Sequence, residues 1–210
     1  MPALFQFRSL NFNNMIFYPD TELPAGKIAF IAGKSGSGKS TLLKLMNASL
    51  SPAAGTIYYR GRDIAELDTI SLRQKVSLVS QDVFLFDGTI SENFRLFYHY
   101  RNMEPPADEQ IMFFLTLCRL EMPLDKEVMT MSGGERQRLY IAVFLSFGPD
   151  VLLLDEPTSA LDHENAAAVL ENLTGYCKKQ KTELIIVSHD LRLIQSFSEH
   201  TLRLEKRNEE

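Results

Sequence analysis

The sequence predicts an α/β fold with a mainly parallel β-sheet, and three features of the chain lead to this prediction. Short apolar runs alternate with longer amphipathic segments, which is typical of strands and helices that alternate along a parallel sheet. Residues 151–154 are apolar throughout and end at two acidic residues, as expected for a strand buried on both faces. A glycine-rich loop follows the apolar run at residues 27–32 and precedes a helical pattern.

Size and composition place these elements in one domain. The chain has 210 residues, and 45% of them are hydrophobic, which is enough for a sizeable core and excludes a disordered or low-complexity chain. The formal net charge of −5 gives no bulk attraction to nucleic acid or to an anionic membrane surface, so no nucleic-acid partner is expected. The sequence therefore predicts a single domain over residues 1–210.

The chain carries no feature typical of a secreted or membrane-spanning protein. Two cysteines, Cys118 and Cys177, are too few for a disulfide framework, and both lie in apolar stretches, which favours buried thiols in a reducing compartment. The N-terminus lacks a basic segment followed by an apolar one, and the longest apolar runs fall well short of the ~20 residues that cross a bilayer. We expect a soluble protein that reaches a membrane only through a partner.

Hydrophobic periodicity predicts the individual elements. The expected strands are residues 27–32, 56–59, 76–79, 151–154 and 183–187, and the expected helices are residues 41–50 and 161–180. Residues 84–131 break the alternation and are rich in Phe, Met and Leu, so a helical subdomain is expected there. Its core is expected to contain an apolar stripe, which comprises Met112, Phe113, Leu115 and Leu117.

The strongest functional signal is a phosphate-binding loop (P-loop) that satisfies the pattern G-x-x-x-x-G-K-[ST]. The segment comprises Gly33, Lys34, Ser35, Gly36, Ser37, Gly38, Lys39, Ser40 and Thr41. Its glycines permit a tight turn in which backbone N–H groups converge on phosphate oxygens at a helix N-terminus. Lys39 can then reach the β- and γ-phosphates, and the Ser40 hydroxyl can bind Mg²⁺. The alternative is a flexible Gly/Ser loop. The predicted strand before the motif and the predicted helix after it disfavour this alternative.

The second signal is the acidic pair Asp155 and Glu156 at the end of the buried strand. Ligands bind at the carboxyl ends of the strands in open α/β sheets. Because neighbouring residues of a strand point to opposite sides, the two carboxylates are expected to play different roles. Asp155 is expected to hold Mg²⁺, directly or through water, and Glu156 to act as general base for the attacking water. Two solvated acids at a strand end are the alternative, which the neighbouring P-loop disfavours.

A third group of motifs identifies a family. Residues 132–138 read Ser-Gly-Gly-Glu-Arg-Gln-Arg, and Gln81 follows a short strand. Residues 159–162 come just after the acidic pair, and residues 188–190 follow the next strand. In this order and at these approximate spacings, the motifs resemble those of the ATP-binding cassette (ABC) ATPases, over about residues 26–204. The resemblance implies a P-loop NTPase fold with a mainly parallel core sheet, a small N-terminal antiparallel β-subdomain and a helical subdomain inserted at about residues 84–131.

The resemblance implies that residues 132–134 serve a nucleotide bound by another subunit. In ABC ATPases this signature loop contacts the γ-phosphate of ATP held by the partner's P-loop, a role that falls here on Ser132, Gly133 and Gly134. The usual signature is Leu-Ser-Gly-Gly-Gln, whereas this chain has Met131 first and Glu135 last. Because Ser-x-x-Glu also spells a capping box, Glu135 is expected to be structural.

Three further roles follow from the same resemblance. Gln81 is expected to contact Mg²⁺ and its water shell and to link the site to the helical subdomain. His189 is expected to contact the γ-phosphate, and Asp162 to communicate across the dimer. Together with Lys39 and Glu156, the residues Gln81 and His189 form the expected catalytic set. Taken alone, Gln81 would be an ordinary polar residue at a strand end, and a lone histidine after a strand would be structural.

The segment before the P-loop departs from the family pattern. ABC ATPases stack adenine on an aromatic residue upstream of the P-loop, but simple alignment places that position near Asn13 or Asn14, which cannot stack. Phe12 is the nearest substitute, and Tyr18 is a second one. The alternative is that these aromatic residues pack an antiparallel β-subdomain. The departure concerns base selectivity and leaves the phosphate chemistry intact.

The resemblance implies the ATP-binding and ATP-hydrolysing subunit of an ABC transporter, with ATP and Mg²⁺ as cofactors. It implies a head-to-tail homodimer on ATP binding, a separate integral membrane permease, and a cytoplasmic location at the inner face of the cell membrane through that permease. Apolar residues around 84–97 would form the groove for a coupling helix of the permease. The chain is similar in particular to small stand-alone bacterial cassettes of the Fet/YbbL type, which are linked with metal export.

Two other classes remain as alternatives. One is a non-transport ABC ATPase that acts in DNA repair, chromosome maintenance or translation. The chain has one cassette and no heptad repeat between the P-loop and the signature, which disfavours this class. The other is a P-loop kinase or a plain nucleotide-binding module, which leaves residues 132–138 and His189 unexplained.

Overall fold

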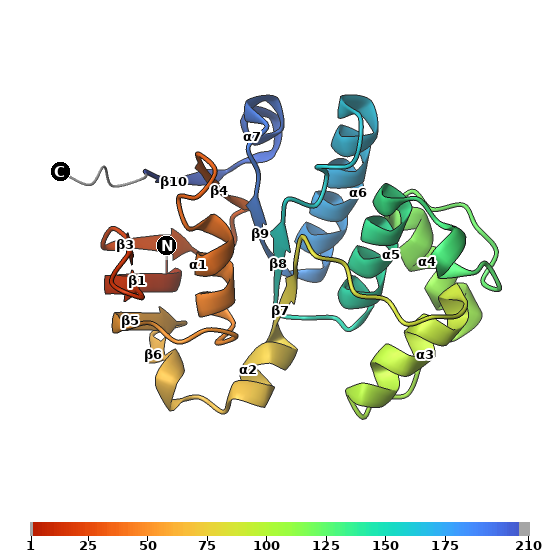
Figure 1. The fold of residues 1–210 in the computed structure, drawn as a ribbon, viewed down its shortest axis with the longest axis horizontal. Coiled ribbons are helices and arrows are strands. Elements are labelled where there is room, and N and C mark those ends of the chain that lie inside the picture. Colours follow the sequence, from red (N-terminus) through yellow and green to blue (C-terminus); the bar gives the residue numbers. More distant parts are fainter. Residues whose placement is uncertain (1, 206–210) are drawn as a thin grey trace.

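The computed structural model describes residues 2–205 and contains a parallel sheet and an antiparallel sheet (Figure 1). The parallel sheet has the strand order β10-β4-β9-β8-β7. Its strands are β4 (Ala29–Gly33), β7 (Val76–Val79), β8 (Val151–Asp155), β9 (Glu183–Val187) and β10 (His200–Leu204). This sheet confirms the predicted fold class. The edge strand β10 was not predicted from the sequence.

The antiparallel sheet lies beside the parallel one and is built around β1 (Ala3–Phe12), which pairs with three other strands. Those strands are β2 (Ile16–Phe17), β3 (Thr21–Pro24) and β5 (Ala54–Tyr59), and β5 also pairs with β6 (Arg62–Asp63). Asn13 and Asn14, both at positive φ, form the turn that returns the chain from β1 to β2. This sheet is the expected N-terminal antiparallel β-subdomain.

The two faces of the parallel sheet belong to two different cores. Along β8, Val151 and Leu153 pack into the core shared with the antiparallel sheet and α1 (Lys39–Met46). Leu152 and Leu154 pack into the core on the other face. All four side chains are fully buried, which is why the sequence of this strand is apolar at every position rather than at alternate ones.

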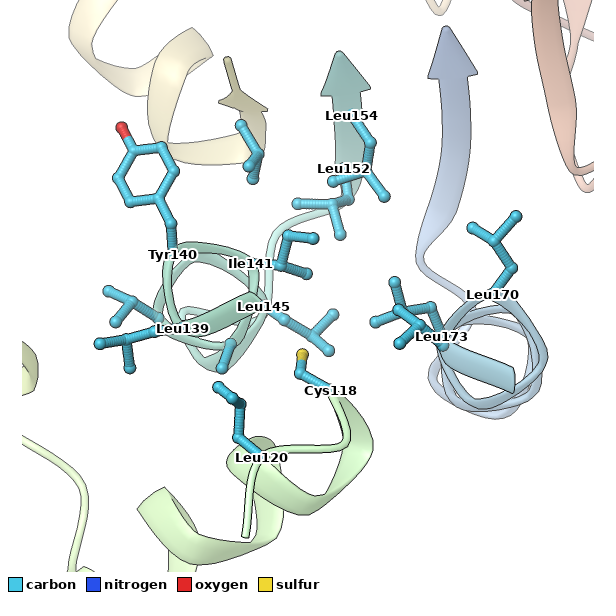
Figure 2. Close-up of a cluster of buried hydrophobic side chains, with 14 of the residues drawn as sticks. Cys118, Leu120, Leu139, Tyr140, Ile141, Leu145, Leu152, Leu154, Leu170 and Leu173 are labelled. Carbon is cyan, nitrogen blue, oxygen red and sulfur yellow. The ribbon is translucent and has the colours of Figure 1, made fainter. Parts of the chain in front are cut away.

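Helices cover the second face of the sheet and extend away from it (Figure 1). They are α3 (Ile90–Tyr100), α4 (Asp108–Leu117), α5 (Gly133–Ser146), α6 (His163–Gln180) and α7 (Leu191–Phe197). Figure 2 shows α5 between β8 and the segment that follows α4, so that Leu152 and Leu154 lie on one side of the helix and Cys118 and Leu120 on the other. The remaining helical elements are α2 (Thr69–Lys75), η1 (Ile64–Glu66) and η2 (Val128–Thr130).

The structure corrects the expected core of residues 84–131. Met112 and Phe113 are 39% and 50% exposed, whereas Leu115 is fully buried. Leu117 is partly buried against the same core, and the other side chains that α4 and the next residue bury are Ile111 and Cys118. The spacing of four and three residues from Ile111 to Leu115 and Cys118 defines the helix face that packs on α5 and α6. Met112 and Phe113 lie at the margin of that face, where the half-exposed Phe113 ring contacts Tyr176 of α6.

Three helix boundaries also differ from the prediction, and the first helix begins at Lys39 rather than at residue 41. The first helix ends at Met46 rather than residue 50, because Ala48 adopts a left-handed conformation with φ of 56°. The other helix begins at His163 rather than at residue 161, because the Asp162 carboxylate caps it by accepting the Asn165 backbone N–H at 3.0 Å. No helix within residues 2–205 is long and apolar enough to cross a membrane.

Cys118 and Cys177 are free thiols buried in the same core. Burial raises the pKa of each thiol to about 12, so roughly one thiolate in ten thousand exists at pH 8. We expect neither cysteine of the native protein to react with Ellman's reagent at pH 8, and both to react after unfolding in guanidinium chloride. Rapid labelling of either thiol without denaturant would contradict this burial.

Candidate functional site

The site lies at the carboxyl ends of β4, β7, β8 and β9, which is where open α/β sheets place their ligands. A cavity of about 510 Å³ opens there. It is lined by Ile16, Ser35, Gly36, Gly38, Lys39, Ser40, Thr41, Gln81, Glu156, Ser159 and His189. The structure thus brings together residues that are widely separated in the chain, including most of the predicted P-loop and catalytic residues.

The P-loop joins β4 to α1, as its motif predicts. Gly38 precedes α1 with φ of 90°, in the left-handed region that glycine adopts without strain. A Cβ at this position would come within 2.6 Å of Ile16 and 2.9 Å of Tyr18. The Tyr18 hydroxyl also donates a hydrogen bond to the Gly38 carbonyl at 3.0 Å. The β2 hairpin therefore packs directly on the loop and fixes its shape.

The Lys39 ammonium group lies inside the curve of this loop. It donates to the carbonyl oxygens of Gly33 at 2.9 Å and Lys34 at 3.2 Å, and the residue is only 9% exposed. The first turn of α1 contains no acidic residue, so the positive end of the helix dipole and the ammonium group act together. This arrangement creates a compact positive field that suits a polyphosphate.

Ser40 and Asp155 form the second part of the site. The Ser40 hydroxyl and the Asp155 carboxylate are in hydrogen-bond contact at 3.0 Å, and Asp155 is 4% exposed. Burial raises the pKa of the Asp155 carboxyl, and this effect outweighs the opposing hydrogen bond from Ser40 and the charges of Lys44 and Lys39. A desolvated carboxylate beside a hydroxyl is a donor set that fits Mg²⁺, a cation that prefers oxygen ligands and few protein groups.

Glu156 and His189 form a separate pair. The Glu156 carboxylate lies 2.9 Å from the His189 Nδ1 atom. The two acids thus have different hydrogen-bond partners, but strand alternation, the basis of the predicted difference in role, is not the reason. The strand β8 ends at Asp155, and Glu156 adopts a left-handed conformation with φ of 51° that turns the backbone away from the strand. The tertiary structure rather than the pleat separates the two carboxylates.

The signature residues lie at the N-terminus of α5 and not in this cavity. The Ser132 hydroxyl accepts the Glu135 backbone N–H at 3.3 Å, and the Glu135 carboxylate accepts the Ser132 N–H at 2.7 Å. These two bonds form the predicted capping box and lower the pKa of the Glu135 carboxyl. Ser132 and Gly133 are exposed, whereas Gly134 is buried against the segment that contains Ala160.

The structure does not place Phe12 or Tyr18 in the cavity. Phe12 packs against the core below the antiparallel sheet, and the Tyr18 ring is 6% exposed beneath the P-loop. Ile16, the cross-strand partner of Phe12, lines the cavity instead. Sequence reasoning missed Ile16, although a reading of Asn13 and Asn14 as a hairpin turn would have brought residue 16 beside residue 12.

Two further residues of the site were not predicted. Ser159 lines the cavity just beyond the acidic pair. Gln137, on α5, donates from Nε2 to the backbone carbonyl of Glu156 at 2.9 Å. Ser159 lies within the motif at residues 159–162, and Gln137 lies within the motif at residues 132–138. Neither motif by itself indicates a contact between α5 and Glu156.

Comparisons with known proteins agree with this geometry. Residues 19–159 match the model of the family described as "ABC transporter". The chain is 39% identical over 181 residues to the probable iron export ATP-binding protein FetA of Escherichia coli strain K12, an alignment that covers 85% of this chain and 77% of that protein.

Solved structures give the same result. The cbiO1 protein of Clostridium perfringens, part of the ABC transporter complex cbiONQ, is 26% identical with a TM-score of 0.83, and the alignment covers 98% of this chain and 86% of that one. A bacterial Atm1-family ABC exporter with ATP bound is 28% identical with a TM-score of 0.85, and the alignment covers 98% of this chain and 38% of the exporter. The chain therefore belongs to the ABC transporter family and is an ATP-hydrolysing subunit of the kind that powers transport.

Proposed function

We propose that two copies of this chain bind head to tail and enclose two MgATP molecules, each between the P-loop of one copy and residues 132–134 of the other. The exposed N-terminus of α5 carries this proposal. Its backbone N–H groups and the two adjacent glycines are suited to an anion, yet they lie outside the chain's own cavity. A second copy would bring that helix end against the triphosphate.

Within each site the residues divide the work of hydrolysis. The P-loop and Lys39 bind and orient the β- and γ-phosphates. Ser40, Asp155 and Gln81 would hold Mg²⁺, which when bound neutralises charge that develops on the phosphate oxygens. Glu156 orients the attacking water and accepts its proton, while His189 holds the Glu156 carboxylate and faces the γ-phosphate.

The γ-phosphate of ATP would control whether the dimer is closed or open. Because it contacts residues of both copies, ATP binds the closed dimer more tightly than the open one, and loss of the γ-phosphate removes that preference. Asp162, which caps α6 just beyond the acidic pair, would contact the other copy. The differential affinity for ATP and ADP is what would drive a transport cycle.

An aromatic surface formed by Phe84, Phe86, Phe97 and Tyr100 is the proposed docking site for the permease. Phe84 and Tyr100 are 57% and 70% exposed, and the rings contact one another edge to face or stacked. Phe94, which lies on α3 together with Phe97 and Tyr100, is fully buried and belongs to the core. An apolar helix of the permease would cover the exposed rings and place this chain at the inner face of the membrane.

The similarity to the Escherichia coli protein supports metal export as the transport process. Purification of the tagged chain from its native membranes tests the transporter role. We expect a multi-span membrane protein to co-purify with it in stoichiometric amount. Recovery with nucleic acid or ribosomes, and without any membrane protein, would instead favour a non-transport ABC ATPase.

Ile16 is the proposed contact for the nucleobase, and it predicts weak base selectivity. An aliphatic side chain offers apolar contact but neither ring stacking nor hydrogen bonds that distinguish adenine from guanine. We expect the wild-type chain to bind ATP and GTP with dissociation constants within a few-fold of each other, and Ile16→Tyr to bind both about fivefold more tightly or better through base stacking. Isothermal titration calorimetry with ATP, GTP and tripolyphosphate, which has no base, measures the dissociation constants.

Met15→Tyr is the matched control for this prediction, because Met15 is the preceding residue, 79% exposed, and does not line the cavity. It should leave all three affinities unchanged. Strong preference of the wild-type chain for ATP over GTP, or no gain from Ile16→Tyr in a variant of unaltered melting temperature, would contradict the assignment.

A further inference from the structure

The backbone of Glu156 adopts a conformation that its own side chain disfavours. With φ of 51°, it lies in the left-handed region, where a residue other than glycine crowds its Cβ against the backbone. The segment that follows offers no helix or strand to hold this conformation, since residues 157–160 form a turn between bends at residues 156 and 161. Such a conformation persists only when surrounding contacts fix it.

Each main-chain polar group of Glu156 has a hydrogen-bond partner outside this segment. Its N–H donates to the Val187 carbonyl of β9 at 3.1 Å. Its carbonyl oxygen accepts two hydrogen bonds, one from Gln137 Nε2 at 2.9 Å and one from the Ser159 N–H of the following turn at 3.2 Å. Gln137 is 5% exposed, so its amide has little access to water and the bond is protected from competition.

Gln137 connects the helix that carries the signature residues to the backbone of Glu156. It lies on α5, one turn after Gly134, and α5 begins at the capped signature residues. The start of α5 also packs on the segment after Glu156, because a Cβ on Gly134 would come within 3.3 Å of the Ala160 carbonyl oxygen. A shift of α5 along its axis would therefore directly move Gln137, whose amide donates to the Glu156 carbonyl.

We propose that Gln137 is a positioning residue that holds Glu156 in its left-handed conformation and so ties the aim of the Glu156 carboxylate to the position of the signature helix. This rests on the proposed role of Glu156 as the general base. When α5 contacts the nucleotide bound by the other copy, the same helix sets the backbone conformation of Glu156 in the cavity of its own chain. Occupancy of one site is thereby linked to the readiness of the neighbouring one.

Gln137→Met tests the proposal, because methionine has similar volume and no N–H donor. We expect kcat for ATP hydrolysis to fall about tenfold or more, since a small misplacement of a catalytic group is costly, while the dissociation constant for ATP changes by less than about twofold. Asn172→Leu is the matched control. It removes a comparable amide–carbonyl bond, 3.1 Å from Asn172 Nδ2 to the Leu117 carbonyl, away from the site, and should retain kcat.

Gln137→Glu supplies a second readout. Its carboxyl group can donate to the Glu156 carbonyl only when protonated, so its rate relative to wild type should rise as the pH is lowered. A relative rate that does not depend on pH would overturn the proposal. So would an unchanged kcat in Gln137→Met, or a loss of kcat that only parallels a loss of thermal stability and is matched by Asn172→Leu.

Glu156→Gln, measured in parallel, separates this inference from the function on which it rests. If Glu156→Gln keeps wild-type turnover, the proposed role of Glu156 fails and the positioning role fails with it. If Glu156→Gln loses turnover while Gln137→Met keeps it, the proposed function stands and only the role of Gln137 is wrong.

Discussion

Replacement of Glu156 by Gln is expected to lower kcat for ATP hydrolysis by about 10²–10⁴-fold, the range that general-base catalysis contributes. The amide keeps the volume of the side chain and a hydrogen bond to His189, so the binding of ATP should not change. Because the γ-phosphate is then retained, ATP should hold two copies together. Phosphate release gives the rate, and size-exclusion chromatography with light scattering gives the mass with ATP and with ADP.

The matched control is Glu164→Gln, which neutralises an exposed acid in the first turn of α6. It should hydrolyse ATP at the wild-type rate and should not accumulate as a dimer. Unchanged turnover of Glu156→Gln would remove Glu156 from the role of base. A monomer under every nucleotide condition, in a variant that binds ATP, would contradict the head-to-tail dimer.

Gly133→Asp is expected to abolish ATP hydrolysis without disturbing the fold. No atom lies within 4 Å of the Cβ that the substitution would add, and an acidic residue in the first turn of α5 is favourable to the helix dipole. Its carboxylate would, however, face the triphosphate bound by the other copy and repel it. Gly133→Asn, which has nearly the same shape and no charge, is the control and should keep most of the activity.

A mixture of two inactive variants tests whether each site is shared between copies. Gly133→Asp alone and Lys39→Ala alone should both be inactive, the first through its signature and the second through its P-loop. In a mixed dimer, the intact P-loop of one chain meets the intact signature of the other, so one site is restored. An equimolar mixture should recover about a quarter of wild-type activity by random pairing of a two-fold dimer. No recovery, with mixed dimers present, would contradict the shared site.

The P-loop and the strand that ends at the acidic pair could be predicted because each is specified by contiguous residues. The nine residues of the loop are contiguous, and the glycines, the lysine and the hydroxyl act within one strand–loop–helix unit. The capping box of Ser132 and Glu135 was predicted for the same reason, since a helix N-terminus is specified within four residues. Interactions over short distances in sequence leave a pattern that can be recognised.

The apolar side chain that the hairpin presents to the cavity could not be predicted in this way. Phe12 and Ile16 are cross-strand partners, and the choice between them depends on how the hairpin packs on Gly38 and Tyr18. The apolar pattern predicts Met112 and Phe113 in the core, but the packing of α4 on α5 and α6 leaves both partly exposed. In both cases an apolar residue was recognised and its direction was not.

The sequence by itself determined the family, the parallel strands next to the site and the position of the P-loop between a strand and a helix, because each rests on contiguous motifs or on a continuous apolar run. Only the tertiary structure decided that Ile16 rather than Phe12 lines the cavity and that Gln137 holds Glu156. It also decided that Glu156 turns away from Asp155 in a left-handed conformation. These features depend on contacts between elements far apart in the chain, and such contacts leave no periodic or local trace in the order of the residues.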